Sequence, residues 1–254
     1  MSVLLIYLYY LCTSDPKNSF MNSFEERLSF WNIAVDRKEL DLFEKYYDIL
    51  IEWNHKFNLT AVTGRDDVYV KHFTDSIALA HYMDLSGKKI LDVGSGAGFP
   101  GIPLAIIHDD CNIVLIDSLN KRVGFLDTVI SSLELSNVTA VCDRAEELGH
   151  DDNFREQFDV VTSRAVAGLN ILSEYCLPFV CDGGMFVSYK GSSVDEELSA
   201  SDNALSVLGG TIETVEKYNI PFTDFPRSLI FIRKSSATPD KYPRHAGRPL
   251  KKPL

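Results

Sequence analysis

The chain has 254 residues, 45% of them hydrophobic, and a formal net charge of −11. This length predicts one main domain with a sizeable core and leaves room for a small appendage. The five cysteines are odd in number and contain no C-x-x-C pair, which argues against a disulfide framework and a cysteine zinc site. We therefore expect a protein of the reducing cytoplasm without a bound metal.

The charge is unevenly distributed along the chain. Residues 227–254 contain eight Lys and Arg residues and one acid, Asp240, so this stretch carries +7 and the remainder is strongly acidic. A basic stretch on an acidic body is typical of a protein that touches a polyanion, although a charged tail can also serve solubility alone. We refer to residues 237–254 as the C-terminal segment and predict that it is a basic tail.

The first residues are apolar. Val3 to Leu11 resemble a signal-peptide core, but they lack a basic start and a small-residue cleavage site and are too few to span a bilayer. We therefore expect residues 1–22 to form a surface or disordered extension without a membrane anchor. Met21 opens a more ordinary amphipathic stretch, so we expect native translation to start there.

Residues 23–86 have the periodicity of helices. Apolar side chains recur at steps of three and four through Phe43, Tyr46, Leu50, Trp53 and Phe57, which indicates one buried stripe along a helix. A second helix is predicted over 67–83. We expect this region to be a helical N-terminal extension that packs on the following domain.

Residues 87–236 alternate between strands and helices, which predicts an α/β domain with a mostly parallel seven-stranded sheet and helices on both faces. The predicted strands are 89–93, 112–117, 138–142, 158–162, 184–189, 211–218 and 228–233. The predicted helices are 100–108, 120–135, 167–180 and 194–208. The connection before 228–233 is too short for a helical crossover, so this last strand is expected to pair antiparallel.

A glycine-rich run, Asp92-x-Gly94-x-Gly96-x-Gly98, joins the first predicted strand to a helix. Glycines allow a tight turn to approach a ligand where a Cβ would collide. An NAD site would have glycine where Phe99 stands, so pyrophosphate fits poorly. S-adenosylmethionine fits better, because it has no phosphate and its cationic methionine part favours a carboxylate such as Asp92.

A second acid strengthens this interpretation. Asp117 ends the next predicted strand, 19 residues after Gly98, where α/β cofactor folds hold the ribose hydroxyls. The combination predicts a class I S-adenosylmethionine-dependent methyltransferase of Rossmann-like fold. The predicted contacts are Gly94, Ser95, Gly96 and Asp117.

Adenine needs an acceptor for its amine, a backbone donor for a ring nitrogen and apolar walls. The third predicted strand leads into Ala145 and Glu146, next to the loop after Asp117. We assign the backbone contact to Ala145 and the side-chain contact to Glu146, although an acid in this place can also cap a helix. Phe99 is predicted to form a wall, with simple packing as the alternative.

Two cations follow strand ends at the edge where ligands lie in such sheets. Arg164 follows the fourth strand and could bind the carboxylate of the cofactor or grip a substrate phosphate with two hydrogen bonds. Lys190 ends the fifth strand at the same edge and is predicted to assist the substrate. Position alone leaves both roles of Arg164 open.

The run LDVGSGAGFPGIPL, residues 91–104, resembles the signature of the RsmG (GidB) methyltransferases, in which Pro-Gly-Ile-Pro after the glycine loop is distinctive. The likeness covers about residues 40–254. Four further stretches agree with that family: Trp53-Asn54 with Asn58-Leu59-Thr60, His72 with Asp75-Ser76, Thr162-Ser163-Arg164-Ala165, and Lys241-Tyr242-Pro243-Arg244 leading to Lys251-Lys252-Pro253-Leu254.

The resemblance implies a bacterial enzyme that methylates N7 of one guanine in 16S ribosomal RNA. It also implies cofactor contacts at Gly94, Phe99, Ala145, Glu146 and Arg164. Residues 149–157 look longer than is usual in the family, which concerns a surface loop. Three alternatives remain: a methyltransferase for a small molecule or protein, a nucleic-acid-binding module that only senses the cofactor, and, last, a nicotinamide dehydrogenase.

Guanine N7 has a lone pair and no proton at neutral pH, so no acid–base residue is required, and Arg164 is the one catalytic candidate. Catalysis is expected to come from alignment of N7 with the methyl–sulfur bond. The expected partner is 16S ribosomal RNA, in the small ribosomal subunit or an assembly intermediate, bound by a monomer. The predicted RNA contacts are Asn58, His72, Lys190, Arg244, Lys251 and Lys252.

Overall fold

The computed structural model describes residues 23–254, so the expectations for residues 1–22, including a start at Met21, lie outside the described residues. The described chain begins with α2 (Phe24–Phe30) and α3 (Arg37–Phe57). Both helices start with a capping box, in which Ser23 or Asp36 bonds a backbone N–H three residues on and a Glu returns the bond. The stripe predicted for α3 is buried at Phe43, Tyr46 and Leu50.

The helix predicted over 67–83 is divided into three pieces. The pieces are α4 (Arg65–Val68), the π-helix η1 (Tyr69–Thr74) and α5 (Asp75–Tyr82). Phe73 of η1 and Ile77 of α5 are fully buried. A single π turn inside a helix shifts the register of the side chains and is frequent at functional sites.

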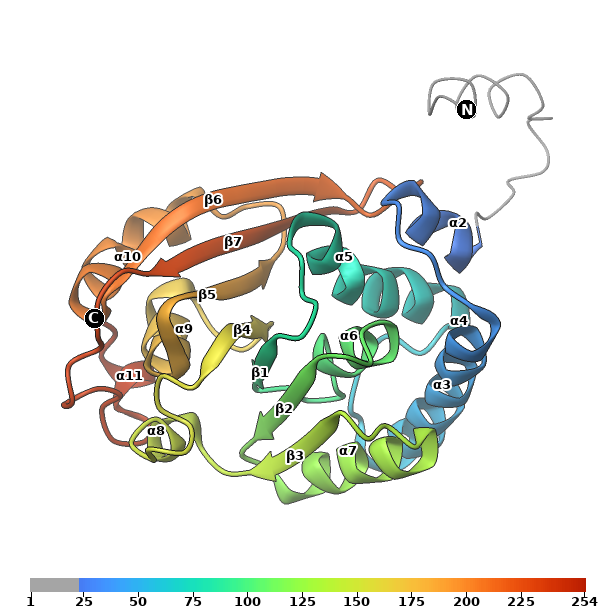
Figure 1. The fold of residues 1–254 in the computed structure, drawn as a ribbon, viewed down its shortest axis with the longest axis horizontal. Coiled ribbons are helices and arrows are strands. Elements are labelled where there is room, and N and C mark those ends of the chain that lie inside the picture. The colour runs from blue at the N-terminus through green and yellow to red at the C-terminus, as the bar shows by residue number, and fades with distance from the viewer. Residues whose placement is uncertain (1–22) are drawn as a thin grey trace.

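Within the described residues, seven strands form one sheet in the order β3-β2-β1-β4-β5-β7-β6 (Figure 1). The strands are β1 (Lys89–Val93), β2 (Asn112–Asp117), β3 (Val138–Cys142), β4 (Phe158–Arg164), β5 (Val180–Lys190), β6 (Gly210–Asn219) and β7 (Pro226–Lys234). β1 to β5 pair in parallel, and β7 pairs antiparallel with both β5 and β6. The predicted α/β class and the antiparallel last strand are confirmed.

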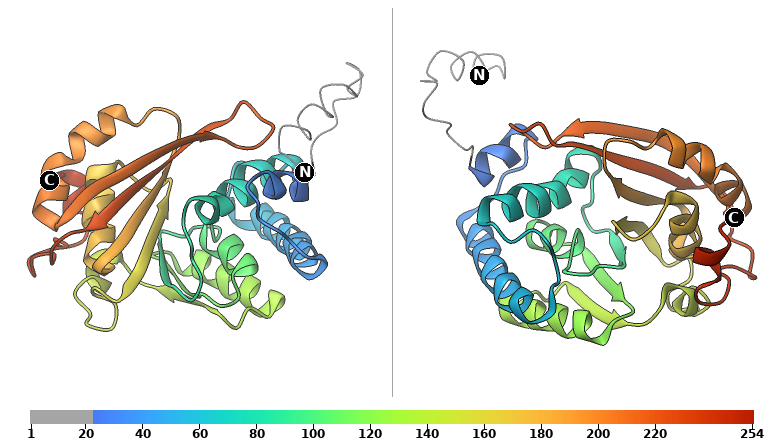
Figure 2. Two further views of the ribbon diagram at one scale, coloured as in Figure 1. Left: turned by 45° about the horizontal axis from the view of Figure 1, so that its top comes forward. Right: turned by 180° about the vertical axis from the view of Figure 1, so that it is seen from behind.

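Helices cover both faces of the sheet (Figure 2). One face is packed by the N-terminal helices with α6 (Gly101–Ile107) and α7 (Asn120–Leu133), the other by α8 (Ala145–Leu148), α9 (Leu169–Cys176) and α10 (Asp195–Leu208). Each face of the sheet has its own hydrophobic core. Successive strand residues point to opposite faces, so that Ile90 of β1 belongs to one core and Leu91 to the other. Two buried faces explain why the strands read as nearly continuous apolar runs.

Three further details differ from the sequence prediction. Helix α8 and the terminal helix α11 (Arg248–Lys251) were not predicted, since each is a single turn with little periodicity. The helix predicted over 167–180 ends at Cys176 and continues as the short 3-10 helix η2 (Leu177–Phe179). Every helix within residues 23–254 is too short or too polar to span a bilayer.

Candidate functional site

The glycine loop leaves β1 with a backbone conformation that favours glycine. Gly94 and Gly98 have φ of 73° and 89°, and a Cβ on Gly94 would lie 2.6 Å from Val166 Cγ2. The backbone N–H groups of Gly94 and Ser95 both donate to the carbonyl oxygen of Ile116, at 2.9 and 3.1 Å. These bonds fix the loop over the end of β2, so that β1 and β2 jointly form one side of a depression.

A cavity of about 430 Å³ lies at the carboxyl ends of β1, β2 and β4. Seven of the residues predicted for cofactor or RNA contact line it: Gly94, Ser95, Gly96, Phe99, Asp117, Arg164 and His72. This is the edge at which ligands bind in open α/β sheets. The sequence therefore predicted half of the residues that line this cavity, although they lie far apart in the chain.

Asp117 supplies the carboxylate of the cavity. Its side chain is nearly buried, Oδ2 accepts from the Gly96 N–H at 3.0 Å, and Oδ1 accepts from the Leu119 N–H at 3.0 Å. Arg122 donates to Oδ2 at 3.2 Å and also lines the cavity. The carboxylate is held in one orientation at the cavity wall, as a group that binds a pair of hydroxyls requires.

Asp92 does not act as predicted. Its carboxylate is fully buried and is not among the cavity-lining groups of the described residues. Oδ1 accepts from Thr162 Oγ1 at 3.0 Å, and Oδ2 accepts from the Gly101 N–H at 3.2 Å, the first residue of α6. Burial raises the pKa of Asp92 to about 6. The expected contact with a cationic ligand is replaced by an internal one, because the strand alternation points the side chain into the core.

Arg164 ends β4 and reaches across to the π-helix. It donates to Asp75 Oδ2 at 3.1 Å and to the carbonyl oxygen of Lys71 at 3.3 Å, and its guanidinium lies 5.0 Å from the centre of the Phe99 ring. Asp75 is also approached by Tyr218 Oη at 3.0 Å and by Arg227 Nε at 3.5 Å. The cation is thus fixed in place at the cavity wall, with one face over an aromatic ring.

The imidazole of His72 stacks on Phe99, with ring centres 4.6 Å apart and an interplanar angle of 25°. Arg164 Nη2 lies 3.3 Å from Nδ1, and Thr60 Oγ1 lies 2.8 Å from Nε2. Nδ1 also lies 3.2 Å from the carbonyl oxygen of Lys71, so both ring nitrogens have hydrogen-bond partners within the protein. Burial, together with the charge of Arg164, lowers the pKa of His72 to about 3, so the ring is neutral.

Ala145 and Glu146 lie at the start of α8, just beyond the end of β3, where Cys142 pairs with Asp117. Neither residue lines the cavity within the described chain. Glu146 is nearly buried, and Oε1 accepts from the Gly247 N–H at 3.0 Å. Their role at adenine remains a prediction, and the structure adds a contact to the C-terminal segment that the sequence did not indicate.

Outside the C-terminal segment, two of the predicted RNA contacts, Asn58 and Lys190, do not line the cavity. Asn58 is an exposed residue in the left-handed conformation that ends α3. Lys190 is engaged internally, since Nζ donates to the Ala167 carbonyl oxygen at 2.8 Å and pairs with Glu197 at 2.6 Å. Its side chain is therefore committed to the loop before α9 and to α10, and the structure does not present it to a substrate.

The C-terminal segment packs on the body instead of projecting as a tail. Arg244 forms a bidentate pair with Glu174 of α9, whose side chain has no solvent exposure. This contact occupies the guanidinium that was predicted to bind RNA. Lys251 and Lys252 are exposed, so these two cations remain accessible at the end of the segment.

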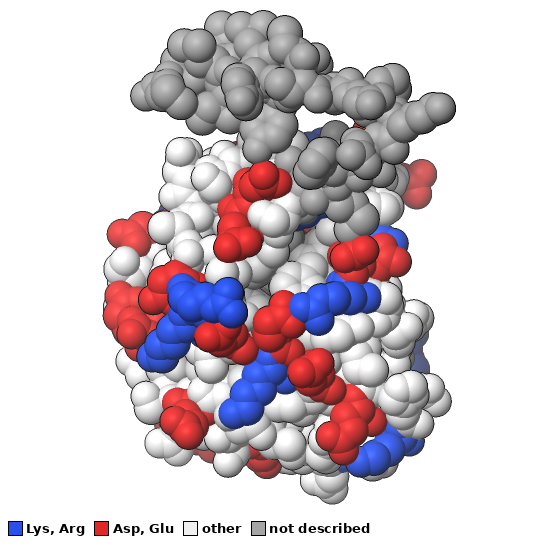
Figure 3. All heavy atoms as spheres, turned by 90° about the vertical axis from the view of Figure 1, so that its right-hand side faces the viewer, with Lys and Arg blue, Asp and Glu red and all other residues white. Residues whose placement is uncertain are grey.

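The side of the molecule formed by α3 and α4 has no uniform charge. Figure 3 shows acidic and basic side chains interspersed on this face. Ion pairs such as Arg37–Asp41 at 3.0 Å and Lys56–Glu52 at 2.8 Å lie within α3. Neighbouring charges of opposite sign cancel beyond a few ångströms, so this face attracts a polyanion weakly.

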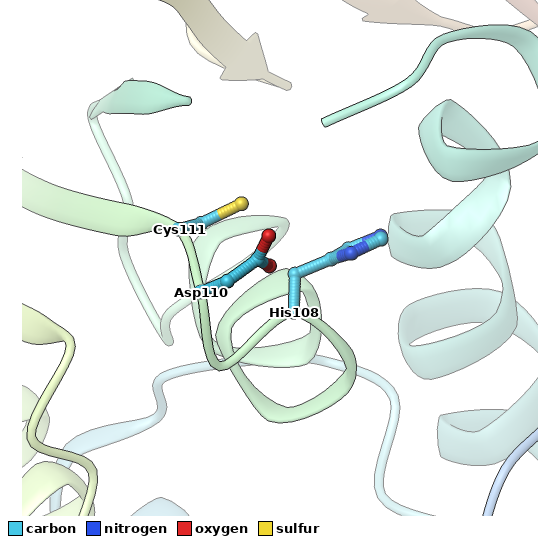
Figure 4. A group of neighbouring side chains, drawn as sticks. All are labelled: His108, Asp110 and Cys111. Atoms are coloured by element: carbon cyan, nitrogen blue, oxygen red, sulfur yellow. The ribbon is translucent and has the colours of Figure 1, made fainter. Parts of the chain in front are cut away.

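A group of residues that could in principle hold a metal ion lies at the opposite edge of the sheet. His108, Asp110 and Cys111 place a ligand atom each within 4.8 Å of one another (Figure 4). Cys111 Sγ donates to the Leu85 carbonyl oxygen at 2.9 Å, and burial raises the pKa of this thiol to about 11. Asp110 Oδ2 accepts from the Gly87 N–H at 2.9 Å, so two of the three side chains already bond the loop before β1, and we assign this group to hydrogen bonding between loops.

Some residues of the cavity were not predicted as site residues. They are Leu59, Thr60, Ala97, Ser118, Arg122, Ala165 and Val166. For Thr60 a signal existed, since it belongs to a stretch that carries the family resemblance. Arg122 had none, because a cation in the first turn of a helix is common on surfaces.

Comparison with solved structures supports the fold described above. Among solved structures, a SAM-dependent methyltransferase from Aquifex aeolicus has a TM-score of 0.52 at 15% identity, covering 67% of this chain and 94% of that chain. A SAM-dependent O-methyltransferase from Thermotoga maritima has a TM-score of 0.50 at 15% identity, with coverages of 75% and 72%. At this identity the likeness concerns the fold, and it confirms the predicted class I methyltransferase fold.

Sequence relatives are much closer. A protein of Lachnoclostridium phytofermentans named ribosomal RNA small subunit methyltransferase G is 48% identical over 234 residues, which cover 92% of this chain and 97% of the relative. The protein of the same name from Bacillus subtilis is 44% identical over 235 residues, with coverages of 92% and 98%. Residues 39–224 match the profile of the GidB family, described as rRNA small subunit methyltransferase G, and the chain therefore belongs to this family.

Proposed function

We propose that this protein transfers a methyl group from S-adenosylmethionine to N7 of one guanine in 16S ribosomal RNA. Membership of the family supports a methyltransferase that acts on the RNA of the small ribosomal subunit. The finer assignment to guanine N7 rests on the resemblance described above and on the chemistry of the cavity.

The contact between Asp92 and Gly101 carries the choice of cofactor. In dinucleotide-binding folds the N-terminus of the first helix is left open for pyrophosphate. Here the carboxylate of Asp92 accepts the first N–H of α6, so the place of an anion is already taken from inside the protein. A cofactor without phosphate, such as S-adenosylmethionine, fits this arrangement, whereas a second negative group would be repelled.

The lining residues suit the parts of such a cofactor. We assign Asp117 to the ribose hydroxyls, the backbone of Gly94 to Gly96 to the methionine part and Phe99 to an apolar wall. Ala145 and Glu146, which are not among the described lining residues but follow the end of β3, are assigned to adenine. Arg164 is already paired with Asp75, so a carboxylate or a phosphate at this edge would meet a cation whose position is preset.

The groups of this cavity do not include a poised general base. His72 is neutral but has both nitrogens engaged, and the carboxylate of Asp117 already accepts three hydrogen bonds. The cofactor when bound supplies an activated methyl group on a sulfonium centre. The protein then has to hold N7, which needs no deprotonation, in line with that group, an effect with an upper range of about 7–11 kcal/mol.

RNA must present the guanine in an accessible form. The major groove of A-form RNA is too deep and narrow for its N7 edge to be reached, so we expect a guanine in a loop or turned out of its stack. The neutral ring of His72, stacked on Phe99 at the cavity, offers a flat surface for such a base. The exposed Lys251 and Lys252 are assigned to phosphate contacts.

The test uses radiolabelled S-adenosylmethionine and small ribosomal subunits from cells that lack this gene. We expect label in 16S RNA and strand cleavage at one position after the treatment specific for 7-methylguanine. Label in RNA without cleavage would contradict the assignment to N7. Label in protein or in a small molecule, or no label, would contradict the assignment to ribosomal RNA.

A further inference from the structure

The C-terminal segment is tied to the body by more polar contacts than a solvated tail requires. Arg244 Nε donates to both carboxylate oxygens of Glu174, at 2.8 and 3.1 Å, Nη2 donates to Oε2 at 2.5 Å, and the Arg244 backbone N–H donates to Oε1 at 2.8 Å. Glu174 is completely buried in α9. A charge in this position is stable only with its partner, so the pair fixes the segment firmly.

A second cation, Arg155, also binds the C-terminal segment, through backbone carbonyl oxygens. Arg155, in the loop before β4, donates to the carbonyl oxygens of Thr238 and Tyr242 at 2.6 and 2.9 Å and to that of Gly149 at 2.7 Å. Pro243 packs on Gly149 so closely that a Cβ there would lie 2.7 Å from its ring. The residues between Thr238 and Arg244 are therefore held against the loop that follows α8.

Further along the C-terminal segment, Gly247 contacts a residue that is assigned to the cofactor. The Gly247 N–H donates to Glu146 Oε1 at 3.0 Å, and Gly247 has φ of 76°, which suits glycine. A carboxylate accepts several hydrogen bonds, so the bond from Gly247 can orient Glu146 while the other oxygen is left for an adenine amine. Helix α11, with Lys251, starts at the next residue.

We propose that Arg244 and Glu174 are positioning residues, which seat the C-terminal segment so that Gly247 orients Glu146 towards the cofactor and the cations of α11 lie beside the bound cofactor. This deepens the proposed function and rests on it. Arg244 thereby acts within the protein and not as a ligand of RNA. Two contacts three residues apart in the segment carry this inference, that of Arg244 with Glu174 and that of Gly247 with Glu146.

The first experiment needs no variant. Hydrogen exchange of the whole protein is followed by mass spectrometry with and without S-adenosylhomocysteine. We expect the ligand to slow exchange in the glycine loop, in residues 145–149 and also in residues 242–249. Slowing confined to the glycine loop and the end of β2 would overturn the proposal. Absence of any binding would instead contradict the proposed function.

The second experiment measures affinity for S-adenosylhomocysteine by calorimetry in Arg244→Gln and in Glu174→Gln. The matched control is Arg233→Gln, because Arg233 also forms a bidentate pair with a glutamate, Glu213, on the exposed surface of β6 and β7. We expect a roughly tenfold weaker affinity in the first two variants, the loss that follows when one well-oriented hydrogen bond to a charged group is disturbed, and none in the control.

The conservative variant Arg244→Lys tests geometry separately from charge. Lysine keeps the charge but lacks the planar fork, so it should keep the fold and recover only part of the affinity. Unchanged affinity in all three variants of the pair would overturn the proposal. Folding of each variant is checked by circular dichroism. A variant that does not fold is replaced by Gly247→Ala, which alters the orienting N–H without removing a buried charge. Unchanged affinity in Gly247→Ala would also overturn the proposal.

Discussion

The carboxyl group of Asp92 is buried between Thr162 and Gly101, and this sets a pH dependence of folding. Its ordinary pKa of 3.8 rises to about 6 in the folded protein, mainly through burial. Between these values the folded state binds more protons than the unfolded chain. The free energy of unfolding therefore falls as the pH rises through this window, by up to about 3 kcal/mol.

The variant Asp92→Asn should remove this dependence, because its amide can bond both neighbours without a charge. Urea titrations at about pH 4.5 and pH 7 measure the free energy of unfolding. We expect its change from pH 4.5 to pH 7 to be more favourable in the variant than in the wild type, by a few kcal/mol. The control is Asp84→Asn, an exposed carboxyl whose pKa is lowered by hydrogen bonds to Ser86, so its removal acts in the opposite direction. Identical pH profiles for wild type and Asp92→Asn would refute the argument.

His72 provides the second prediction at this scale. Burial and the neighbouring Arg164 lower its pKa to about 3, so we expect its ring nitrogens to keep the shifts of a neutral imidazole from about pH 8 to pH 5 in nitrogen NMR. Arg164→Gln should raise this pKa, since it removes a positive charge next to Nδ1. A titration of His72 near pH 6.5 in the wild type would show that the ring is open to water.

At the scale of single elements, the sequence predicted the helices and strands that a local hydrophobic pattern marks. All seven predicted strands exist, and the alternating burial of two-faced strands explains why their apolar runs were readable. The π-helix was missed, because the extra residue per turn in 69–74 leaves the apolar spacing on both sides intact. That turn carries His72 and adjoins Asp75, so the missed irregularity lies at the candidate site.

Gly101 offers a test of how tightly the first unit, β1 with its loop and α6, is packed. A Cβ on Gly101 would lie 2.2 Å from Leu115 Cδ2 and 3.2 Å from Asp92 Oδ2. We expect Gly101→Ala to lower the free energy of unfolding by about 1–3 kcal/mol, as overpacking does. It should also weaken binding of S-adenosylhomocysteine, because α6 and the glycine loop move together.

Gly124 is the matched control, since it also lies in a helix, α7, but a Cβ there would have no atom within 4 Å. Alanine favours a helix over glycine, so Gly124→Ala should raise stability by up to about 1 kcal/mol. Both variants are compared by denaturant unfolding. Equal effects of the two substitutions would show that the space next to Leu115 adjusts without cost.

At the scale of the whole molecule, the sequence predicted which residues lie at strand ends, but it did not predict contacts between segments that are far apart in the chain. Strand ends of a parallel sheet meet at one edge, and this rule alone brought Gly94, Asp117 and Arg164 to one cavity. The bond from Gly247 to Glu146 spans 101 residues, and the pair of Arg244 with Glu174 spans 70. No periodicity encodes such contacts, so the sequence predicts a basic tail where the structure has a segment packed on the body.

The last prediction concerns how this acidic protein binds RNA. Its net charge of −11 opposes binding, so local cations must provide the attraction. Lys251 and Lys252 are exposed at the end of the anchored segment. If each neutralises a phosphate, Lys251→Ala combined with Lys252→Ala should lower the slope of log affinity against log salt concentration by about 1.4–1.8, and weaken binding most at low salt.

The measurement is a salt titration of binding to small ribosomal subunits. A double variant of equal charge change, Lys56→Ala with Lys217→Ala, removes exposed lysines that already pair with Glu52 and Asp195. Neither control lysine belongs to the C-terminal segment, so the slope of this control variant should match that of the wild type. If the Lys251 and Lys252 variant keeps the wild-type slope, these cations do not touch phosphate, and the attraction for RNA must come from another part of the surface.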